Sequence, residues 1–182
     1  MSNIFFASDY HFDHANLLTF ADDKGNKLRN FDDVSEMNEY IIEKHNQRVK
    51  PADKIYMLGD ISFNLSGLQL LNRMNGTKVL IKGNHDNLKL AQYMQFFKDV
   101  RATHQMSGVI MSHVPIHPDS LARWGVNIHG HLHTYKVKLP DGSLDRRYYN
   151  VSVECLDDYT PISLEEIKSQ VEMPVLPKRT KK

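Results

Sequence analysis

The sequence predicts an α/β or layered α+β domain, because short β-rich runs alternate with amphipathic segments along the chain. The length of 182 residues supports the same conclusion, since it is enough for one sizeable core and too short for two large ones. We therefore expect one domain over residues 1–172. Residues 173–182, which end in the basic sequence KRTKK, are expected to form a flexible tail.

The first half of the chain is predicted to alternate strands with helices. Runs of apolar residues predict strands over 3–7, 54–58 and 78–81. The first helix should begin near Ser35, a favourable N-cap residue, and end near Val49, because Pro51 removes a backbone donor. Two further helices are expected over 65–74 and 88–97.

The second half is predicted to be richer in strands. These are expected over 99–103, 108–112, 125–129, 135–139 and 147–154. Asp141 and Gly142 fit the tip of a hairpin turn between the last two strands. A final helix should begin at Ser163, because Glu166 three residues later completes a capping box.

Charge and cysteine content narrow the classes of partner. The 23 basic and 22 acidic residues nearly cancel, so neither a membrane nor a long nucleic acid is expected as a partner. The single cysteine, Cys155, has no intramolecular disulfide partner, lies in a strand-like run and is expected to be a packed thiol. No apolar run reaches the length of a membrane span. These features predict a cytoplasmic protein.

Metal-ligating side chains follow five of the predicted strands. They are Asp9 and His11, then Asp60, then Asn84, His85 and Asp86, then His113, and finally His131 and His133. A single polar turn of this kind more often satisfies backbone groups alone. The carboxyl ends of parallel strands, however, converge on one crevice, which would gather these residues into one site. The mixture of carboxylate, amide and imidazole favours an oxygen-tolerant divalent ion over a structural zinc.

The series Asp-x-His, Gly-Asp, Gly-Asn-His-Asp, His and Gly-His-x-His resembles the signature of the calcineurin-like metallophosphoesterase superfamily. It spans residues 9–133 in this chain. The resemblance implies a four-layer αββα sandwich, in which two mixed β-sheets are flanked by helices. It also implies a dinuclear metal site at the carboxyl ends of the strands.

The resemblance further implies a role for each matched position. One metal would take Asp9, His11 and His133, and the other would take Asn84, His113 and His131. Asp60 would bridge the two metals. His85 would face the phosphate and the leaving group, and Asp86 would orient His85.

Two cations about 3.5 to 4 Å apart can share a hydroxide and neutralise the charge that develops during an in-line displacement at phosphorus. We therefore expect a hydrolase of phosphoester bonds, with a preference for small or nucleotide-like phosphodiesters, in which His85 assists the leaving group. The alternatives are a phosphomonoesterase or protein phosphatase of the same family, or a non-catalytic protein-binding scaffold. Mn²⁺ is the expected ion, with Fe²⁺, Zn²⁺, Ni²⁺ and Co²⁺ as alternatives.

Several further residues are weaker candidates. His14, Asn16 and His117 lie near the motifs in sequence and are candidate substrate contacts. Candidate phosphate clamps are Arg29, Arg123, Arg146 and Arg147. The remaining histidines are expected to be structural: His45 at a helix surface or edge, His104 in a polar connection, and His129 packed on a strand.

Overall fold

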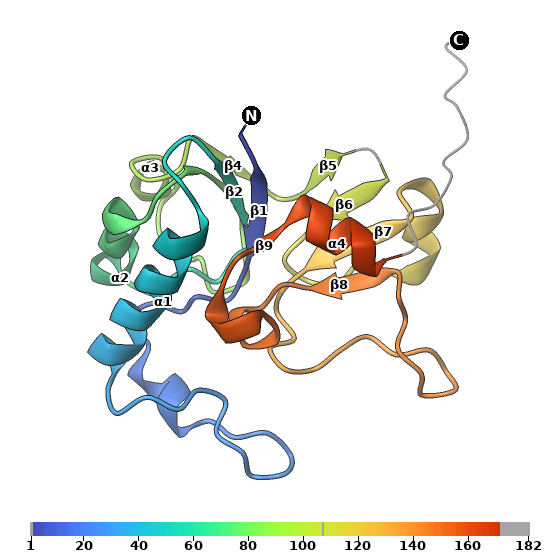
Figure 1. The fold of residues 1–182 in the computed structure, drawn as a ribbon, viewed down its shortest axis with the longest axis horizontal. Helices are drawn as coiled ribbons and strands as arrows, with labels where there is room; N and C mark the ends of the chain where they lie inside the picture. The colour runs from blue at the N-terminus through green and yellow to red at the C-terminus, as the bar shows by residue number, and fades with distance from the viewer. Residues whose placement is uncertain (1, 107, 172–182) are drawn as a thin grey trace.

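The computed structural model describes residues 2–106 and 108–171, and its strands form two sheets (Figure 1). The first has the order β4-β3-β2-β1-β9 and contains β1 (Ile4–Ala7), β2 (Lys54–Met57), β3 (Thr77–Ile81), β4 (Asp99–Arg101) and β9 (Ile162–Ser163). The second has the order β5-β6-β7-β8 and contains β5 (His104–Met106), β6 (Val109–Met111), β7 (Val126–His129) and β8 (Tyr148–Asn150). In both sheets one edge strand, β9 or β5, is antiparallel and the other pairs are parallel.

Helices flank the two sheets. The α-helices are α1 (Val34–Arg48), α2 (Leu65–Gln69), α3 (Leu90–Tyr93) and α4 (Leu164–Gln170). Figure 1 shows α1, α2 and α3 on one side of the five-stranded sheet and the four-stranded sheet on the other. The helix α4 lies beside β8, where the Tyr149 hydroxyl donates a hydrogen bond of 2.9 Å to Gln170 Oε1. The predicted class, two mixed β-sheets flanked by helices, is confirmed.

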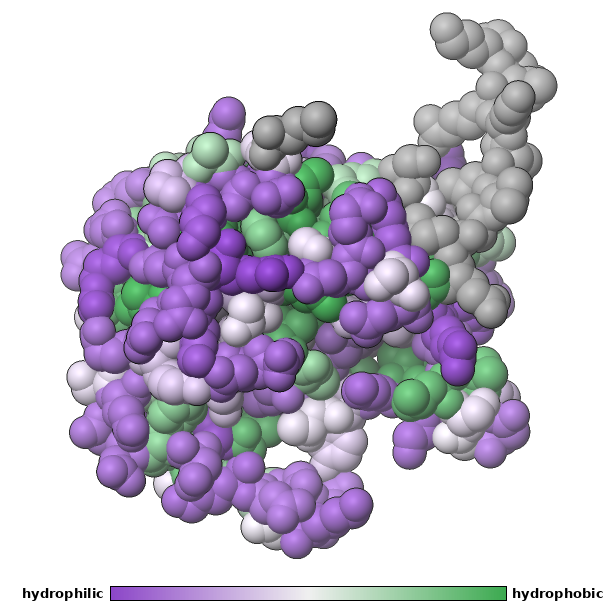
Figure 2. All heavy atoms as spheres, in the orientation of Figure 1, coloured by the Kyte–Doolittle hydropathy of each residue, from purple (hydrophilic) through white to green (hydrophobic). Residues whose placement is uncertain are grey.

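The central parallel strands β1, β2, β6 and β7 are buried almost throughout. In β1, Phe5, Phe6 and Ala7 are all buried, and Val109 and Met111 are buried in the same way in β6. Continuous apolar runs of this kind are typical of parallel strands covered on both faces. Polar side chains that serve a functional site are therefore expected in the loops at the ends of these strands. The surface in Figure 2 is correspondingly mostly hydrophilic on the visible face, with hydrophobic side chains showing in small areas.

The helix ends follow local capping chemistry. The N-cap of α1 is Asp33, whose carboxylate accepts a hydrogen bond of 2.9 Å from the Glu36 backbone N–H, and not the predicted Ser35. An aspartate two residues earlier satisfies the free backbone N–H groups of the first turn in the same way. The predicted capping box between Ser163 and Glu166 is present at the start of α4.

Two predicted strands differ from the structure in the second half of the chain, and two observed strands were not predicted. Residues 135–139 form no regular strand and contribute only an isolated bridge between Lys138 and Leu144, although the turn at Asp141–Gly142 forms. The strand expected over 147–154 stops at Asn150 and continues into the 3₁₀ helix η4 (Val153–Cys155). The short edge strands β5 and β9 were not predicted either. The partner of β9 is β1, at the opposite end of the chain, whereas β5 pairs as a hairpin with the strand β6 that follows it.

The predicted helices over 65–74 and 88–97 are shorter than expected. The first divides into α2 and the 3₁₀ helix η2 (Leu70–Arg73), and the second is limited to α3. The remaining 3₁₀ helices are η1 (Ala15–Thr19), η3 (Pro118–Arg123) and η5 (Asp157–Tyr159).

His45 was expected at a helix surface or edge, and that expectation is wrong. Its side chain is 0% exposed. Both ring nitrogens are satisfied in this buried position, by the Tyr10 hydroxyl at 3.3 Å and the Asn75 carbonyl at 2.9 Å. The predicted basic tail, 173–182, lies outside the described residues. None of the helices in the described ranges has the length and apolarity needed to cross a membrane.

Candidate metal centre

Backbone hydrogen bonds hold the loops after four strands against one another. The Asp9 N–H donates to Gly59 O at 3.0 Å, and the His11 N–H donates to Asp60 O at 3.0 Å. In the other sheet, the Gly130 N–H donates to His113 O at 2.9 Å. The two sheets meet through a parallel bridge between Ser8, just after β1, and Ser152, just after β8. The polar groups that follow these strands are therefore brought to one edge of the molecule.

The backbone at this edge adopts a rare conformation. Five of the predicted metal ligands have a positive φ: Asp9 (59°), His11 (48°), Asp60 (54°), His131 (70°) and His133 (47°). A non-glycine residue in the left-handed region costs on the order of 1–3 kcal/mol and persists where the surrounding structure imposes it. Such a concentration of strained residues is typical of a functional site.

Glycines allow the loops to approach closely. A Cβ atom on Gly59 would lie 2.6 Å from the Gly83 backbone, and one on Gly83 would lie 2.2 Å from Asp60 Oδ1. A Cβ atom on Gly130 would lie 2.4 Å from Asp9 Oδ2. These glycines precede Asp60, Asn84 and His131, so their lack of a side chain is what lets these candidate ligands reach the centre.

The side chains gather into two sets of ligand atoms. The first ligand group is Asp9, His11 and His133, and the second ligand group is Asp60, His113 and His131. Within each group the ligand atoms lie within 4.8 Å of one another. The first group is the set that the resemblance implies for one metal. The second shares His113 and His131 with the set implied for the other metal and contains Asp60, the residue expected to bridge the two.

Asp60 and Asn84 complete the arrangement. Asp60 Oδ2 lies 3.2 Å from His113 Nε2 and 3.7 Å from His11 Nε2, so the carboxylate stands between the two groups. Asn84 Oδ1 lies 2.9 Å from His113 Nε2, which places the amide oxygen at the second group. The predicted bridging and amide positions are thus brought together with the imidazoles.

Several of these atoms fit a bound cation. Asp9 Oδ1 and His11 Nε2 are buried and have no hydrogen-bond partner among the described residues. Buried polar atoms are nearly always satisfied, and each unsatisfied one requires an explanation. A divalent ion held by one oxygen and two nitrogens in each group would satisfy them, and this donor set suits first-row transition metals.

Burial disfavours the charged forms of two side chains in the first group. Burial raises the pKa of Asp9 above its ordinary value. Burial, together with the charge of Arg29, lowers the pKa of His11 to about 3, so its imidazole is neutral and able to ligate at neutral pH.

Asp60 and His113 form a coupled pair in the second group. Burial opposes the charged form of each, but their hydrogen bond and mutual attraction outweigh it. The pKa of Asp60 is consequently lowered and the pKa of His113 is raised. The carboxylate is therefore kept ionised and available to a cation.

A buried ion pair supports the first group from behind. Arg29 is 1% exposed, and its Nε donates to Glu154 Oε1 at 2.8 Å. Glu154 Oε1 lies 3.1 Å from His133 Nδ1, so that Nε2 is the ring nitrogen left for a metal. Although burial opposes it, the charges of Arg29 and His133 lower the pKa of Glu154 to about 2. Arg29 also donates to the Asp9 and Tyr10 carbonyls, so it is not available as the phosphate clamp that was considered for it.

Asp86 has a different role from the predicted one. Its buried carboxylate accepts hydrogen bonds from the backbone N–H groups of Asp60 at 2.9 Å, Ile61 at 3.0 Å and Gly83 at 2.8 Å. Among the described residues it makes no hydrogen bond to His85. Asp86 therefore fixes the two loops that present Asp60 and Asn84 and does not orient His85 directly.

His85 lies at the exposed rim of the centre. Its ring centroid is 5.7 Å from that of His11 and 4.7 Å from that of Phe63, and its backbone N–H donates to Asp60 Oδ1 at 2.9 Å. This position beside both ligand groups leaves the imidazole free to meet a bound substrate.

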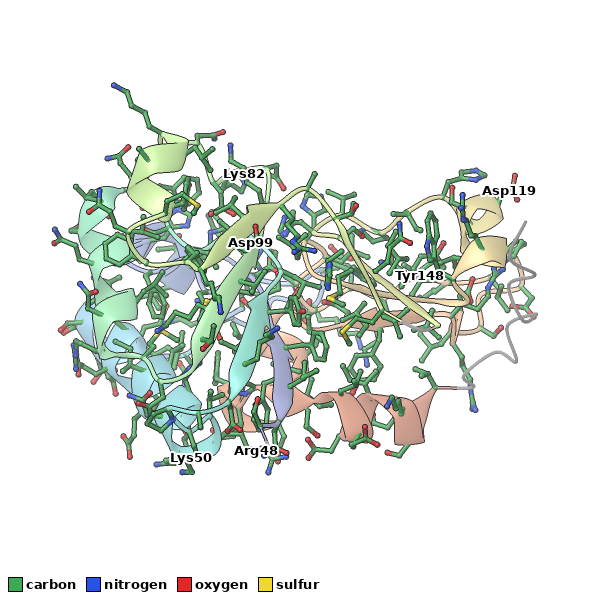
Figure 3. All side chains as sticks on the ribbon, turned by 90° about the horizontal axis from the view of Figure 1, so that it is seen from above. Arg48, Lys50, Lys82, Asp99, Asp119 and Tyr148 are labelled. Carbon is green, nitrogen blue, oxygen red and sulfur yellow. The ribbon has the colours of Figure 1, made fainter. Side chains whose placement is uncertain are left out.

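Of the candidate substrate contacts, His14 lies beside the metal centre and His117 does not. His14 lies next to the centre, with its ring 5.7 Å from that of His11, and Asn16 is exposed on the following 3₁₀ helix η1. His117 is exposed at the N-cap of η3, where its ring accepts from the Asp119 N–H. Figure 3 labels Asp119 at the far end of the four-stranded sheet from Lys82, which precedes Gly83. The structure thus does not bring His117 to the centre.

The three histidines expected to be structural are placed as follows. His129 is packed, as predicted, and its Nδ1 pairs with Gly130 O at 2.8 Å. His104 lies in the unpredicted strand β5 and stacks on Tyr56. His45 is buried within α1, as described above. Cys155 is partly buried and its thiol donates to His133 O at 2.9 Å, while burial raises its pKa to about 11.

Sequence reasoning missed Glu154, Ser152 and Phe63. Ser152 Oγ donates to Asp9 Oδ2 at 2.8 Å, and Glu154 holds His133. Both lie in the sequence NVSVECL, where an acidic and a hydroxyl residue interrupt an apolar run. That interruption was the available signal, because a charge in such a run requires a partner. Phe63 carried no sequence signal.

Known proteins resemble the chain over nearly its whole length. No family model matches it. An uncharacterized protein of Methanocaldococcus jannaschii, MJ1445, is 32% identical over 177 residues, which cover 94% of this chain and 93% of that protein. The Gene 66 protein of Mycobacterium phage D29 is 26% identical, with 94% and 96% covered.

A solved structure shows the same fold. The protein of unknown function AQ665 from Aquifex aeolicus superimposes with a TM-score of 0.70 at 22% identity, covering 94% of this chain and all of that one. The family is shown by the 32% sequence identity to the archaeal protein over nearly the whole of both chains. The chain belongs to the family of the uncharacterized protein MJ1445 of Methanocaldococcus jannaschii.

Proposed function

We propose that the protein is a metal-dependent phosphoesterase of the calcineurin-like superfamily, acting with two divalent ions. One observation carries this proposal: two groups of one carboxylate and two imidazoles face each other with Asp60 between them, at the carboxyl ends of parallel strands. The residues of these two groups all come from the motif series that resembles the superfamily signature. Unsatisfied buried atoms on Asp9 and His11 support a cationic occupant.

The residues of the chain have separate tasks in this proposal. The two ligand groups and Asn84 would hold the ions, and Asp60 would contribute its carboxylate to both. When bound, two divalent ions supply Lewis-acid polarisation of phosphoryl oxygens and lower the pKa of a water molecule. His85, on the exposed rim, donates a proton to the departing oxygen of the ester.

Phosphodiesters are the preferred substrate class within this proposal. The 23 basic and 22 acidic residues of the sequence nearly cancel, which argues against long nucleic acids and in favour of small esters. The test compares bis(p-nitrophenyl) phosphate with p-nitrophenyl phosphate, in the presence of Mn²⁺ and after chelation. Faster hydrolysis of the diester supports the preference, and faster hydrolysis of the monoester assigns the protein to the monoesterase alternative.

The metal stoichiometry tests the centre itself. Chelated protein should take up two Mn²⁺ ions per chain, measured by elemental analysis after gel filtration, and hydrolysis should appear with them. Uptake of fewer than two ions, or no hydrolysis with any of the first-row divalent ions, would favour the non-catalytic scaffold.

The substitution His85→Ala separates catalysis from metal binding. It should lower kcat by about 100- to 10,000-fold, because it removes the proton donor, while both ions remain bound. His104→Ala is the control, since His104 lies in β5, away from the ligand groups. Loss of metal from the His85 variant would contradict this division of tasks.

A further inference from the structure

Phe63 is a large apolar residue exposed at the rim of the metal centre. Phe63 is 41% exposed, yet its ring lies against three imidazoles. The centroid distances are 4.6 Å to His14, 4.7 Å to His85 and 5.6 Å to His11. An exposed phenylalanine that contacts the reacting groups of a site is better explained by ligand contact than by core packing.

The chain on both sides of Phe63 is fixed. The buried Ser62 Oγ donates to Phe12 O at 2.9 Å, and Asn64 caps α2 by accepting from the Gly67 N–H at 2.8 Å. The ring is therefore presented from an anchored segment between β2 and α2. A surface that is already ordered binds a ligand without a further loss of conformational entropy.

The ring is oriented so that part of it remains available. It stacks on His11 with an interplanar angle of 27° and is tilted by 59° to His85. Because 41% of the residue is exposed, part of the ring remains accessible to solvent in the neighbourhood of His85. A flat ring of a ligand can pack there in the offset-stacked or edge-to-face geometry that aromatic pairs favour.

We infer that Phe63 is a specificity determinant that stacks a planar aromatic or heteroaromatic ring carried by the leaving group of the substrate. The inference rests on the proposed phosphoesterase function. Because Phe63 adjoins His85, a ring packed on it brings the ester oxygen to the imidazole that protonates it. Esters of aryl alcohols, or of alcohols that bear a nucleobase-like ring, fit this site better than simple alkyl esters.

Two stable phosphonates of similar size isolate the effect of the ring. Phenylphosphonate presents a flat π face, whereas cyclohexylphosphonate presents an aliphatic ring, and neither is hydrolysed. Binding to the Mn²⁺-loaded protein is measured by isothermal titration calorimetry. We expect about five- to tenfold tighter binding of phenylphosphonate to the wild type, which is the magnitude of one aromatic pair.

Substitutions of Phe63 then assign the preference to this residue. Phe63→Leu and Phe63→Met should reduce the preference to less than about twofold, and Phe63→Tyr should keep it. Phe20→Leu is the matched control, because Phe20 is 48% exposed and its ring contacts His14 and not His85. This control should keep the full preference.

The inference is overturned if the wild type binds both phosphonates equally or does not bind phenylphosphonate. It is also overturned if the leucine and methionine variants keep the wild-type preference. A ring preference without hydrolysis of any phosphoester would contradict the proposed function and leave the stacking platform intact. Hydrolysis without a ring preference would contradict the platform alone.

Discussion

The two ligand groups are similar in composition but are supported by different parts of the structure. The first group depends on side chains that are distant in sequence, because Arg29 and Glu154 form a buried ion pair behind His133 and Asp9. The second group depends on backbone geometry. There, His113 Nδ1 pairs with Leu58 O at 2.6 Å.

This difference indicates how each half of the centre can fail. A buried ion pair loses its balance when one partner is removed, because the other charge remains in a desolvated position. Closely packed loops fail when a side chain is added where only glycine fits. The first group should therefore be sensitive to changes of charge at a distance, and the second to changes of shape nearby.

The substitution Glu154→Gln should have the largest effect. It leaves Arg29 buried without its anionic partner, so the free energy of unfolding of the metal-free protein should fall by about 3–5 kcal/mol. Metal affinity at the first group should also fall by about 10- to 100-fold, because Glu154 orients the ligand His133. Denaturant unfolding and calorimetric titration with Mn²⁺ measure the two effects.

Glu165→Gln is the matched control for that experiment. The Glu165 side chain is 82% exposed, and it forms a surface ion pair with Lys168. This substitution should leave both stability and metal affinity nearly unchanged. Equal effects of the two substitutions would mean that the buried ion pair does not support the first group.

The substitution Gly59→Ala should break the second group. Gly59 has a φ of +89°, and an added Cβ would lie 2.6 Å from both the Gly83 backbone and His113 Nδ1. Steric strain of this kind costs about 1–3 kcal/mol in addition to the conformational strain of about 1 kcal/mol. The expected result is a loss of about 2–4 kcal/mol in stability, with weaker metal binding at the second group.

Gly142→Ala separates the two contributions. Gly142 has a φ of +84° and nothing within 4 Å of the added Cβ, so only the conformational strain remains. Its stability should fall by about 1 kcal/mol, with unchanged metal binding. If Gly59→Ala were no more harmful than this variant, close packing of the loops would not be what forms the second group.

A smaller effect is expected from His45, which lies outside both groups. Burial lowers its pKa from 6.5 to about 4, so the unfolded chain binds a proton before the folded protein does. Its contribution is fully present above pH 6.5 and is lost as pH falls towards 4, by on the order of 2–3 kcal/mol.

The variant His45→Gln should lack this part of the pH dependence while keeping a hydrogen-bond donor near the Asn75 carbonyl. The stability difference between wild type and variant, measured by denaturant unfolding of chelated protein, should shrink between pH 6.5 and pH 4. A difference that stays constant over this range would mean that another group carries the acid sensitivity.

The sequence predicted the central strands well because their apolar runs are buried on both faces. The strands β1, β2, β3, β6 and β7 all lie within the predicted segments, apart from one residue at the start of β3. The segment 135–139, YKVKL, alternates with lysines but finds no neighbouring strand, so it remains irregular. Strand formation at the edges was decided by available partners rather than by local residue preference.

The candidate ligands were found from sequence because their types and their positions after apolar runs are local features. The role of Asp86 could not be found from the sequence, because the three backbone N–H groups that it accepts from lie in loops that meet only in the folded protein. For the same reason, nothing in the sequence indicated that Arg29 would form an ion pair with Glu154, which is 125 residues away.

The sequence by itself determined which donors this protein offers and that they stand where buried strands end, since both follow from residue type and hydrophobic periodicity. The division of the donors into two groups with Asp60 between them was implied only by the family resemblance and is created by the tertiary structure, which also decides that Phe63 lies at the rim. Those relations depend on strand order and on the packing of one sheet against the other. They are set by contacts between distant segments, which local sequence does not encode.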